Sequence, residues 1–299
     1  MTTTKPLVSP EPVLRCAGVV AGHDGVAVVT GLDLVVCEGE VVALLGANGV
    51  GKTTTLLSIS GLIPLLDGTI ELFGQDLSAT QRNRFGLTRR SSRSKQVVDR
   101  ARAGIAHVPE DRALFFDLTV RQNLCLAARQ KASKRQAPRI QSSVGPVEPL
   151  EPVEPVEPIA PVGTSGRAGF LTEAELLDQV LEYFPALVAL LEQPAGVLSG
   201  GQQQMLAIGR GLMSQPKLLM VDELSLGLAP ILVEQLLPVL RSIAQATGIA
   251  VLIVEQHVHL ALAVSDRAYL LRRGKSAVSG TSAELAARSD LVEAGYFGD

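Results

Sequence analysis

The chain has few cysteines and no marked excess of charge. These two features argue against a disulfide-stabilised protein and against bulk binding of nucleic acid. Cys16, Cys37 and Cys125 are the only cysteines in 299 residues and form no closely spaced pair. That pattern favours buried free thiols in a reducing cytosol over a disulfide framework. The formal net charge is −3, so the composition does not favour bulk binding of nucleic acid.

The chain also has no long apolar segment. No uncharged apolar stretch reaches the ~18 residues of a membrane span, and residues 1–6 lack the apolar core of a signal peptide. We therefore expect a soluble, cytoplasmic protein, unless a membrane partner recruits it. Hydrophobic residues make up 46% of the sequence, which is enough for a sizeable core in one large or two modest domains.

A glycine-rich segment, GANGVGKT at residues 46–53, has the spacing of a nucleotide phosphate-binding loop. Glycines let the backbone curl so that its N–H groups point at the phosphates, where a Cβ would obstruct them. The lysine would reach the terminal phosphates, and the threonine after it would offer its hydroxyl to Mg²⁺. The next helix would favour the anion through its N-terminal dipole. The predicted nucleotide-binding residues are Gly46, Ala47, Asn48, Gly49, Val50, Gly51, Lys52, Thr53 and Thr54.

Two consecutive carboxylates end a later apolar run, KLLMVDE at residues 217–223. The strand Leu218–Val221 would place both beside the glycine loop, because the chain begins to curve where the strand ends. Asp222 is the expected partner of Mg²⁺, directly or through water. Glu223 is then placed to polarise the attacking water as a general base, with Lys52 as the second catalytic residue.

The order of apolar runs predicts an α/β fold with a mainly parallel sheet. Residues 13–45 alternate such runs with turns, which predicts a small, mostly antiparallel sheet before the phosphate loop. The predicted strands outside it are Val41–Leu45, Thr69–Phe73, Gly104–Val108, Leu218–Val221, Ile249–Val254, Arg267–Leu271 and Ser276–Val278. The predicted helices are Val120–Gln130, residues 200–214 and Pro230–Ala246, the last bent or interrupted near Pro238.

Two segments depart from this alternation. Residues 82–102 hold eight Arg and Lys with serines between them, and we interpret them as a solvated surface loop rather than a lipid or nucleic-acid contact. Residues 131–169 contain the three-residue repeat VEPLEPVEPVEPIAP, which favours an extended, disordered insertion without a core. Limited proteolysis should cut first in this insertion.

A third motif, LSGGQ at residues 198–202, places glycines and a serine hydroxyl at a predicted helix entrance, which makes an anion site. GANGVGKT, LSGGQ and LLMVDE occur in this order and together resemble the ATP-binding cassette (ABC) ATPases. The resemblance covers nearly the whole chain apart from the two unusual segments. It implies a P-loop NTPase cassette with an N-terminal antiparallel β subdomain and a helical subdomain that carries the signature.

This resemblance also implies a pair of cassettes. In the family two subunits pack head to tail, and each ATP lies between one phosphate loop and the partner's signature. The signature residues expected at the partner's nucleotide are Ser199, Gly200, Gly201 and Gln202. The expected ligands are ATP and Mg²⁺, and the expected partners are a second ATPase subunit, transmembrane permease subunits and, indirectly, a substrate-binding protein.

Three further residues stand at positions with a known role in the family but differ from the residue type that is usual there. His23 matches the aromatic residue that stacks on adenine, although a solvated turn histidine explains it equally well. Glu110 matches a glutamine that senses Mg²⁺, and its carboxylate can still engage the metal or its water. Gln256 matches a catalytic histidine that steadies the γ-phosphate, and it can donate a hydrogen bond but cannot carry a proton's charge.

Longer matches point to a subfamily. VPEDRALFFDLTVRQNL, DELSLGLAP and VEQHVHLALAVSDRAYLL resemble the shorter ATPase subunit of branched-chain amino-acid importers, and the related urea and short-amide importers share these features. Leu224 in place of proline is unusual for either group, and Ala229 replaces an aspartate found in many family members. The resemblance implies a flexible N-terminus over 1–12 and one ATPase domain over 13–299. A helical subdomain would span about 111–214 and contain the insertion.

These features predict an ATPase that energises a membrane importer from the cytoplasmic face of the membrane. Two other classes stay open: a soluble ABC ATPase that acts on nucleic acid or ribosomes, and a weakly hydrolysing regulatory cassette. Only the arginine-rich segment favours the first of these. The residues Gln256 and Ala229 motivate the second.

Overall fold

The computed structural model describes residues 11–77, 81–82, 88–89, 93–132 and 171–288. The predicted insertion at 131–169 lies almost entirely outside these ranges. The first strand begins at Pro12, the last residue of the N-terminal segment predicted over 1–12.

A six-stranded sheet forms the centre of the protein, with strand order β12-β11-β3-β10-β9-β8. Strands β11, β3, β10, β9 and β8 run parallel, and β12 pairs antiparallel with β11 at one edge. The bounds are β3 Val41–Leu45, β8 Ile105–Val108, β9 Leu218–Asp222, β10 Ala250–Glu255, β11 Arg267–Arg272 and β12 Lys275–Thr281. The prediction of a mainly parallel α/β sheet is confirmed.

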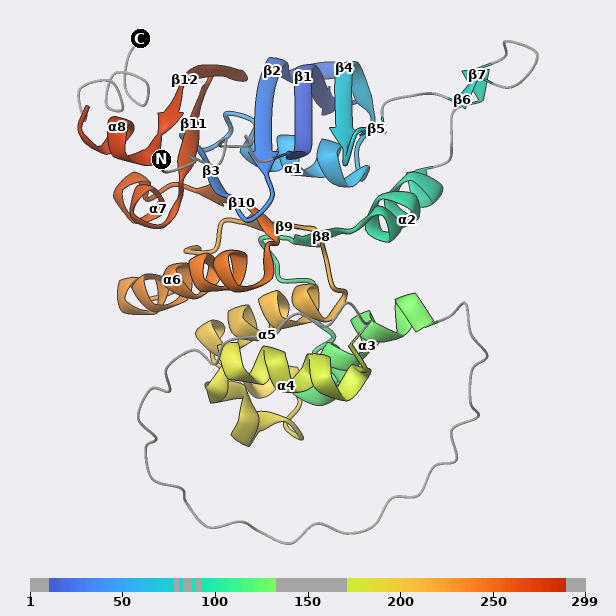
Figure 1. The fold of residues 1–299 in the computed structure, drawn as a ribbon, viewed down its shortest axis with the longest axis vertical. Coiled ribbons are helices and arrows are strands. Elements are labelled where there is room, and N and C mark those ends of the chain that lie inside the picture. The colour runs from blue at the N-terminus through green and yellow to red at the C-terminus, as the bar shows by residue number, and fades with distance from the viewer. Residues whose placement is uncertain (1–10, 78–80, 83–87, 90–92, 133–170, 289–299) are drawn as a thin grey trace, which may run out of the picture.

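A second, antiparallel sheet has the order β2-β1-β4-β5. Its strands are β1 Pro12–His23, β2 Val26–Cys37, β4 Leu65–Leu72 and β5 Gln75–Asp76, so the strand predicted at 69–73 begins four residues earlier. A short separate pair joins β6 Gln81–Arg82 to β7 Thr88–Arg89. Figure 1 shows β1, β2 and β4 at one end of the molecule, with α1 between them and the parallel strands.

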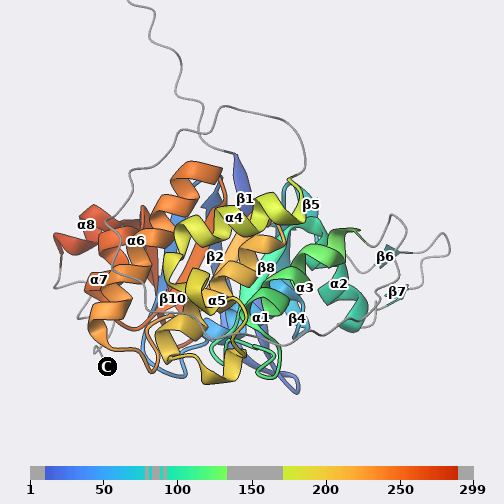
Figure 2. The same ribbon diagram turned by 90° about the horizontal axis from the view of Figure 1, so that it is seen from below.

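Helices cover the other face of the parallel sheet. In Figures 1 and 2, α5 and α6 lie next to this sheet, and α3 and α4 lie on the far side of α5. The α-helices are α1 Lys52–Ser60, α2 Arg93–Ala103, α3 Val120–Ala132, α4 Glu173–Tyr183, α5 Gly200–Met213, α6 Pro230–Thr247, α7 Val258–Val264 and α8 Ser282–Ala286. Short 3-10 turns span Pro185–Leu190 and Ala195–Val197.

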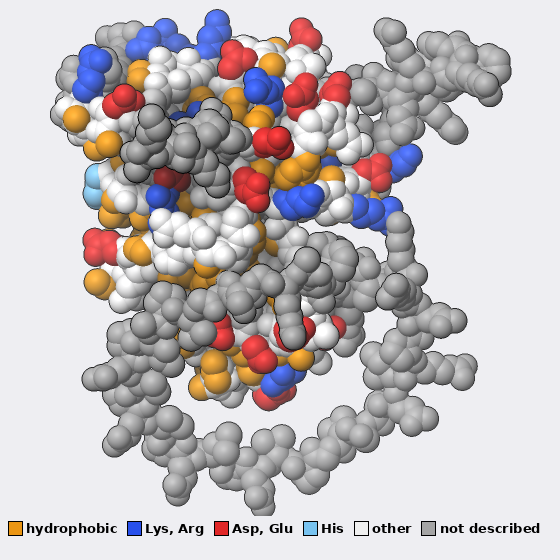
Figure 3. Space-filling view, in the orientation of Figure 1, with side chains coloured by type: hydrophobic (Ala, Val, Ile, Leu, Met, Phe, Trp, Pro, Cys, Tyr) orange, Lys and Arg blue, Asp and Glu red, His pale blue; other side chains and the backbone are white. Residues whose placement is uncertain are grey.

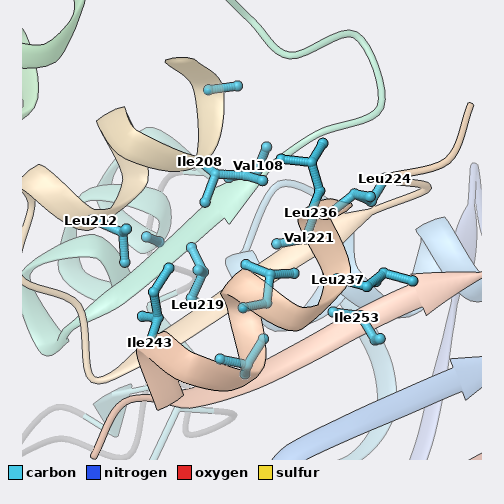
Figure 4. Close-up of a cluster of buried hydrophobic side chains, with 14 of the residues drawn as sticks. Val108, Ile208, Leu212, Leu219, Val221, Leu224, Leu236, Leu237, Ile243 and Ile253 are labelled. Atoms are coloured by element: carbon cyan, nitrogen blue, oxygen red, sulfur yellow. The ribbon is translucent and has the colours of Figure 1, made fainter. Parts of the chain in front are cut away.

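The core has two parts because successive strand residues point to opposite faces. On β3, Val41, Ala43 and Leu45 join the cluster under the helices, whereas Val42 and Leu44 join the cluster under the antiparallel sheet. Figure 4 shows side chains of β8, β9 and β10 meeting those of α5 and α6 in the first cluster. Strands β3, β9 and β10 are therefore apolar on both faces up to their last residue, which is the pattern predicted from the sequence.

Helix α6 runs unbroken through Pro238, so the interruption predicted there is absent. The proline ring lies on the exposed side of the helix, while Leu236, Leu237 and Leu240 are buried on the opposite side. Packing of that apolar side holds the helix together despite the missing N–H hydrogen bond.

The interpretation of residues 82–102 as a solvated loop is wrong for its second half. Residues 93–103 form helix α2, and Arg100 is only 5% exposed. Its guanidinium donates to the carbonyl oxygens of Ser58 and Ile59 at the end of α1, the second at 2.6 Å. The last carbonyls of an α-helix lack the usual partner four residues on, and only that of Ser58 also accepts from the Gly61 N–H, at 3.2 Å, so Arg100 caps the helix that follows the phosphate loop.

Candidate functional site

The phosphate loop joins β3 to α1 and has a backbone that only glycine can adopt at two points. Gly46 and Gly51 have φ angles of 151° and 107°. A Cβ on Gly46 would lie 2.7 Å from the Leu271 carbonyl oxygen, and one on Gly51 would lie 2.7 Å from a Val29 methyl group. The residues between them, Ala47, Asn48 and Gly49, are exposed, so the turn presents its outer side to a ligand.

Lys52 begins α1 and is almost completely buried. Its Nζ donates to the carbonyl oxygens of Gly46 at 2.9 Å and Ala47 at 3.1 Å, and lies 3.6 Å from Glu223 Oε1. The helix starts at this lysine, two residues before Thr54, because Gly51 takes the left-handed conformation just before it. The Lys52 ammonium, held over the turn in this way, is positioned to bind a phosphate group.

Asp222 ends β9 and is 1% exposed. Neither carboxylate oxygen has a hydrogen bond of normal geometry to any residue in the described part of the chain. Burial raises the pKa of Asp222 to about 6; the Thr53 hydroxyl opposes the shift, and the charges of Glu223 and Glu110 add to it. A buried carboxylate without a partner is unfavourable by itself and fits a cation.

Two other predicted metal ligands influence the same carboxyl group. The Thr53 hydroxyl lowers the pKa of Asp222, and the charge of the exposed Glu110 raises it. Within the described ranges, no cluster of three or more His, Cys, Asp or Glu side chains could hold a metal by itself. Mg²⁺ binds in this way in many proteins, with few protein ligands and with oxygens from phosphate and water. The residues present therefore fit Mg²⁺ bound together with a nucleotide.

Glu223 follows the strand with φ 42°, a left-handed conformation that is rare for a residue with a side chain. This reversal turns its carboxylate toward Lys52, although successive strand residues point apart. Gln256 Nε2 donates to Glu223 Oε2 at 2.9 Å, so the glutamine predicted from the family position contacts the predicted general base. Lys52, Glu223 and Gln256 thus meet in one place from α1, the end of β9 and the end of β10.

The signature segment lies at the start of α5. Ser199 is the N-cap and forms a reciprocal capping box with Gln202, accepting from its N–H at 3.4 Å and donating its own N–H at 2.9 Å. Gly200 lies against Leu228 and Gly227, in the segment that follows the two carboxylates. In the isolated chain the signature side chains therefore cap their own helix.

His23 ends β1 at an exposed hairpin, and its side chain forms no hydrogen bond or ion pair with other residues that the structure describes. This geometry agrees with a solvated turn residue as well as it does with a residue that stacks on adenine. Sequence reasoning also missed Glu255, a fully buried carboxylate that accepts hydrogen bonds from Ser225. The available signal was a carboxylate at the end of an apolar strand, directly before Gln256.

The model of the ABC transporter family matches residues 29–225, which include the phosphate loop, the signature and both carboxylates. The chain belongs to the ABC transporter family. It is 36% identical over 265 residues to the high-affinity branched-chain amino acid transport ATP-binding protein BraG of Pseudomonas aeruginosa, covering 87% of this chain and 89% of BraG.

Solved cassettes share the fold of this ABC protein. A nucleotide-free ATP-binding cassette from an ABC transporter aligns with a TM-score of 0.67 at 22% identity, over 97% of this chain and all of the other. The dimeric structure of MJ0796, a bacterial ABC transporter cassette, aligns with a TM-score of 0.66 at 18% identity, over 90% and 98% of the two chains. The protein is therefore an ABC ATPase that hydrolyses ATP for transport.

The surface of this ABC cassette carries both signs of charge. Figure 3 shows Lys and Arg interspersed with Asp and Glu over the described part of one face. Among the described helices, none is both long and apolar enough to cross a bilayer.

Proposed function

We propose that this ABC ATPase energises an importer of branched-chain amino acids. The resemblance to BraG supports the substrate class, because it extends over most of both chains. The observation that carries hydrolysis is the meeting of Lys52, Glu223 and Gln256, with Glu223 held 2.9 Å from the amide of Gln256 and 3.6 Å from the lysine.

In the proposed mechanism the loop amides and Lys52 bind the phosphates of ATP. Lys52 already lies over the turn, so its charge meets the terminal phosphates without rebuilding the loop. Glu223 accepts a proton from the attacking water, and Gln256 holds the carboxylate in position through its amide N–H. The side chains of Thr53, Asp222 and Glu110 would hold Mg²⁺, which neutralises phosphate charge when bound.

We also propose that two cassettes form the working unit, as a homodimer or with a sibling subunit. The signature residues, Ser199 to Gln202, would then face the partner's nucleotide. The dimeric structure of MJ0796, which shares the fold of this chain, supports this arrangement. Permease subunits would recruit the pair to the cytoplasmic face of the membrane, and a substrate-binding protein would deliver the cargo.

Purified full-length protein tests hydrolysis. Glu223→Gln should retain MgATP binding, since the amide is isosteric, but lose at least about 100-fold in ATP turnover, within the range for a general base. Lys52→Ala should instead weaken MgATP binding itself. Near-normal turnover of Glu223→Gln, or wild-type protein that does not bind MgATP at millimolar concentration, would overturn the proposal.

Uptake measurements test the substrate class. Cells that lack the gene should lose high-affinity uptake of labelled leucine, isoleucine and valine, and the wild-type gene should restore it while the Glu223→Gln gene should not. Loss of urea or short-amide uptake with normal uptake of the three amino acids would favour the other importer class.

A further inference from the structure

Glu255 is a buried carboxylate next to the proposed hydrolysis site. It ends β10, is 0% exposed and directly precedes Gln256. Among the described residues no Lys or Arg forms an ion pair with it, and His257 Nδ1 lies 3.9 Å from Glu255 Oε2. A group of this kind is costly to bury unless hydrogen bonds satisfy its oxygens.

Ser225 satisfies both oxygens. Its backbone N–H donates to Glu255 Oε1 at 3.0 Å, and its hydroxyl donates to Oε2 at 2.6 Å. The Gln256 N–H adds a longer bond of 3.3 Å to Oε2. His257 Nδ1 lies 3.1 Å from the same Ser225 oxygen and completes this network of contacts.

These contacts support a strained part of the backbone. Glu223 lies two residues before Ser225 with φ 42°, a conformation that costs about 1–3 kcal/mol for a residue with a side chain. Its N–H donates to the Val254 carbonyl at 3.0 Å, and its carbonyl accepts from Leu226 N–H at 3.0 Å. Two neighbours at the end of β10 thus hold two points of one turn: Gln256 binds the Glu223 side chain, and Glu255 binds Ser225.

We propose that Glu255 and Ser225 form a positioning pair for the catalytic carboxylate of Glu223. By holding the turn at Ser225, Glu255 keeps Glu223 in its left-handed conformation, so that its carboxylate faces Lys52 and the bound nucleotide. Neither residue belongs to the proposed nucleotide or metal contacts, so both act through Glu223. This inference depends on the proposed role of Glu223 in hydrolysis.

The proposal differs from a purely structural role in a measurable way. Loss of the pair would let the turn relax, which misplaces a base that acts in the chemical step and leaves the phosphate loop unchanged. The expected signature is therefore a fall in kcat at nearly constant affinity for MgATP. A structural role would lower the temperature of unfolding but leave kcat unchanged for the folded molecules.

Ser225→Ala and Ser225→Thr form the decisive comparison in the purified full-length chain. At a temperature where circular dichroism shows every variant folded, Ser225→Ala should lower kcat about 10-fold or more, with the MgATP Kd within about two-fold of wild type. Ser225→Thr retains the hydroxyl and should restore most of the loss. Ser265→Ala serves as a matched control, because it removes another buried serine hydroxyl, before β11 at the amino end of the parallel sheet.

Glu255→Gln, which keeps the volume but changes the acceptor set, should also lower kcat, and its effect should not add to that of Ser225→Ala. Normal kcat in folded Ser225→Ala, an equal loss in Ser225→Thr, or an equal loss in Ser265→Ala would overturn the inference. If Glu255→Gln does not fold, the comparison of Ser225→Ala with Ser225→Thr still tests the inference. Normal turnover in Glu223→Gln would remove the proposed function itself, whereas loss there with normal Ser225→Ala removes only the positioning role.

Discussion

At the scale of single residues, two adjacent carboxylates acquire different properties from their surroundings. Asp222 is closed off from solvent and its oxygens have no hydrogen-bond partner among the described residues, whereas Glu223 contacts both Lys52 and Gln256. The first is suited to a metal ion and the second to proton transfer. The sequence predicted these two roles, and the reversal of the backbone at Glu223 explains how two adjacent side chains come to have different surroundings.

Asp222→Asn should stabilise the nucleotide-free protein at pH 8 and change little near pH 4. The pKa of Asp222 is raised to about 6 from 3.8, so the folded state holds this proton more tightly than the unfolded chain does. The resulting loss of stability is absent below pH ~4 and complete above pH ~6. We expect a gain of ~1–3 kcal/mol at pH 8, measured by urea denaturation.

The exposed Asp117 provides the control, since Asp117→Asn should change stability by less than ~0.5 kcal/mol at either pH. MgATP should remove the advantage of Asp222→Asn, because a cation relieves the wild-type charge. An equal gain at pH 4 and pH 8 would show that packing rather than ionisation is responsible.

At the scale of elements, side-chain hydrogen bonds fasten the signature helix to the loop after β8. Arg112 donates to Gln204 at 2.9 Å and to Gln203 at 3.0 Å, both on α5. Arg210 of α5 donates back to the Ala113 carbonyl at 2.7 Å. Arg112 and Ala113 both have positive φ, so these contacts hold an unfavourable backbone beside Glu110.

Arg112→Ala should destabilise the protein by ~1–3 kcal/mol, because it leaves the buried amide oxygen of Gln204 without its donor. The stability of Arg112→Lys should lie between those of the wild type and Arg112→Ala, since an ammonium cannot reproduce the forked donor geometry of a guanidinium. Urea denaturation measures both changes. Arg121→Ala breaks an exposed ion pair with Glu192 and should cost less than ~1 kcal/mol. Equal losses for Arg112→Ala and Arg121→Ala would contradict this account.

At the scale of the whole molecule, the signature residues contact their own helix and the segment after the two carboxylates, and no described contact joins them to the phosphate loop. Ser199 caps its own helix, and the large apolar side chains of Leu226 and Ile231 are 45% and 59% exposed in the neighbouring segment. An apolar surface beside an unused anion site is suited to a second cassette. Nucleotide held between two subunits would join them.

The full-length Glu223→Gln protein should therefore form a dimer when MgATP is added and return to monomer when ATP is withdrawn. Slowed hydrolysis keeps the nucleotide in place, and sedimentation velocity measures the change in mass. Lys52→Ala should stay monomeric under the same conditions, because it binds nucleotide weakly. A monomer in both variants at saturating MgATP would contradict the homodimer and leave pairing with a sibling subunit.

Local patterns predicted most of the strands and several helices. Runs such as Val41–Leu45 and Leu218–Val221 are apolar at every position, which is possible only where both faces of a strand are covered. Helix α2 escaped prediction because its sequence is strongly basic and has few apolar residues, and the buried guanidinium of Arg100 has no local signature. The break expected in α6 did not occur, because buried leucines opposite Pro238 outweigh one missing hydrogen bond.

The sequence by itself determined the phosphate loop, the motifs and the apolar strands of the parallel sheet, because each of these is a run of neighbouring residues. Only the tertiary structure decided that Gln256 contacts Glu223, that Glu255 holds Ser225 and that Arg100 caps α1. These contacts join residues 30 to 42 positions apart. Their geometry depends on how parallel strands end side by side and on which helix packs against which, and neither is encoded in any local spacing.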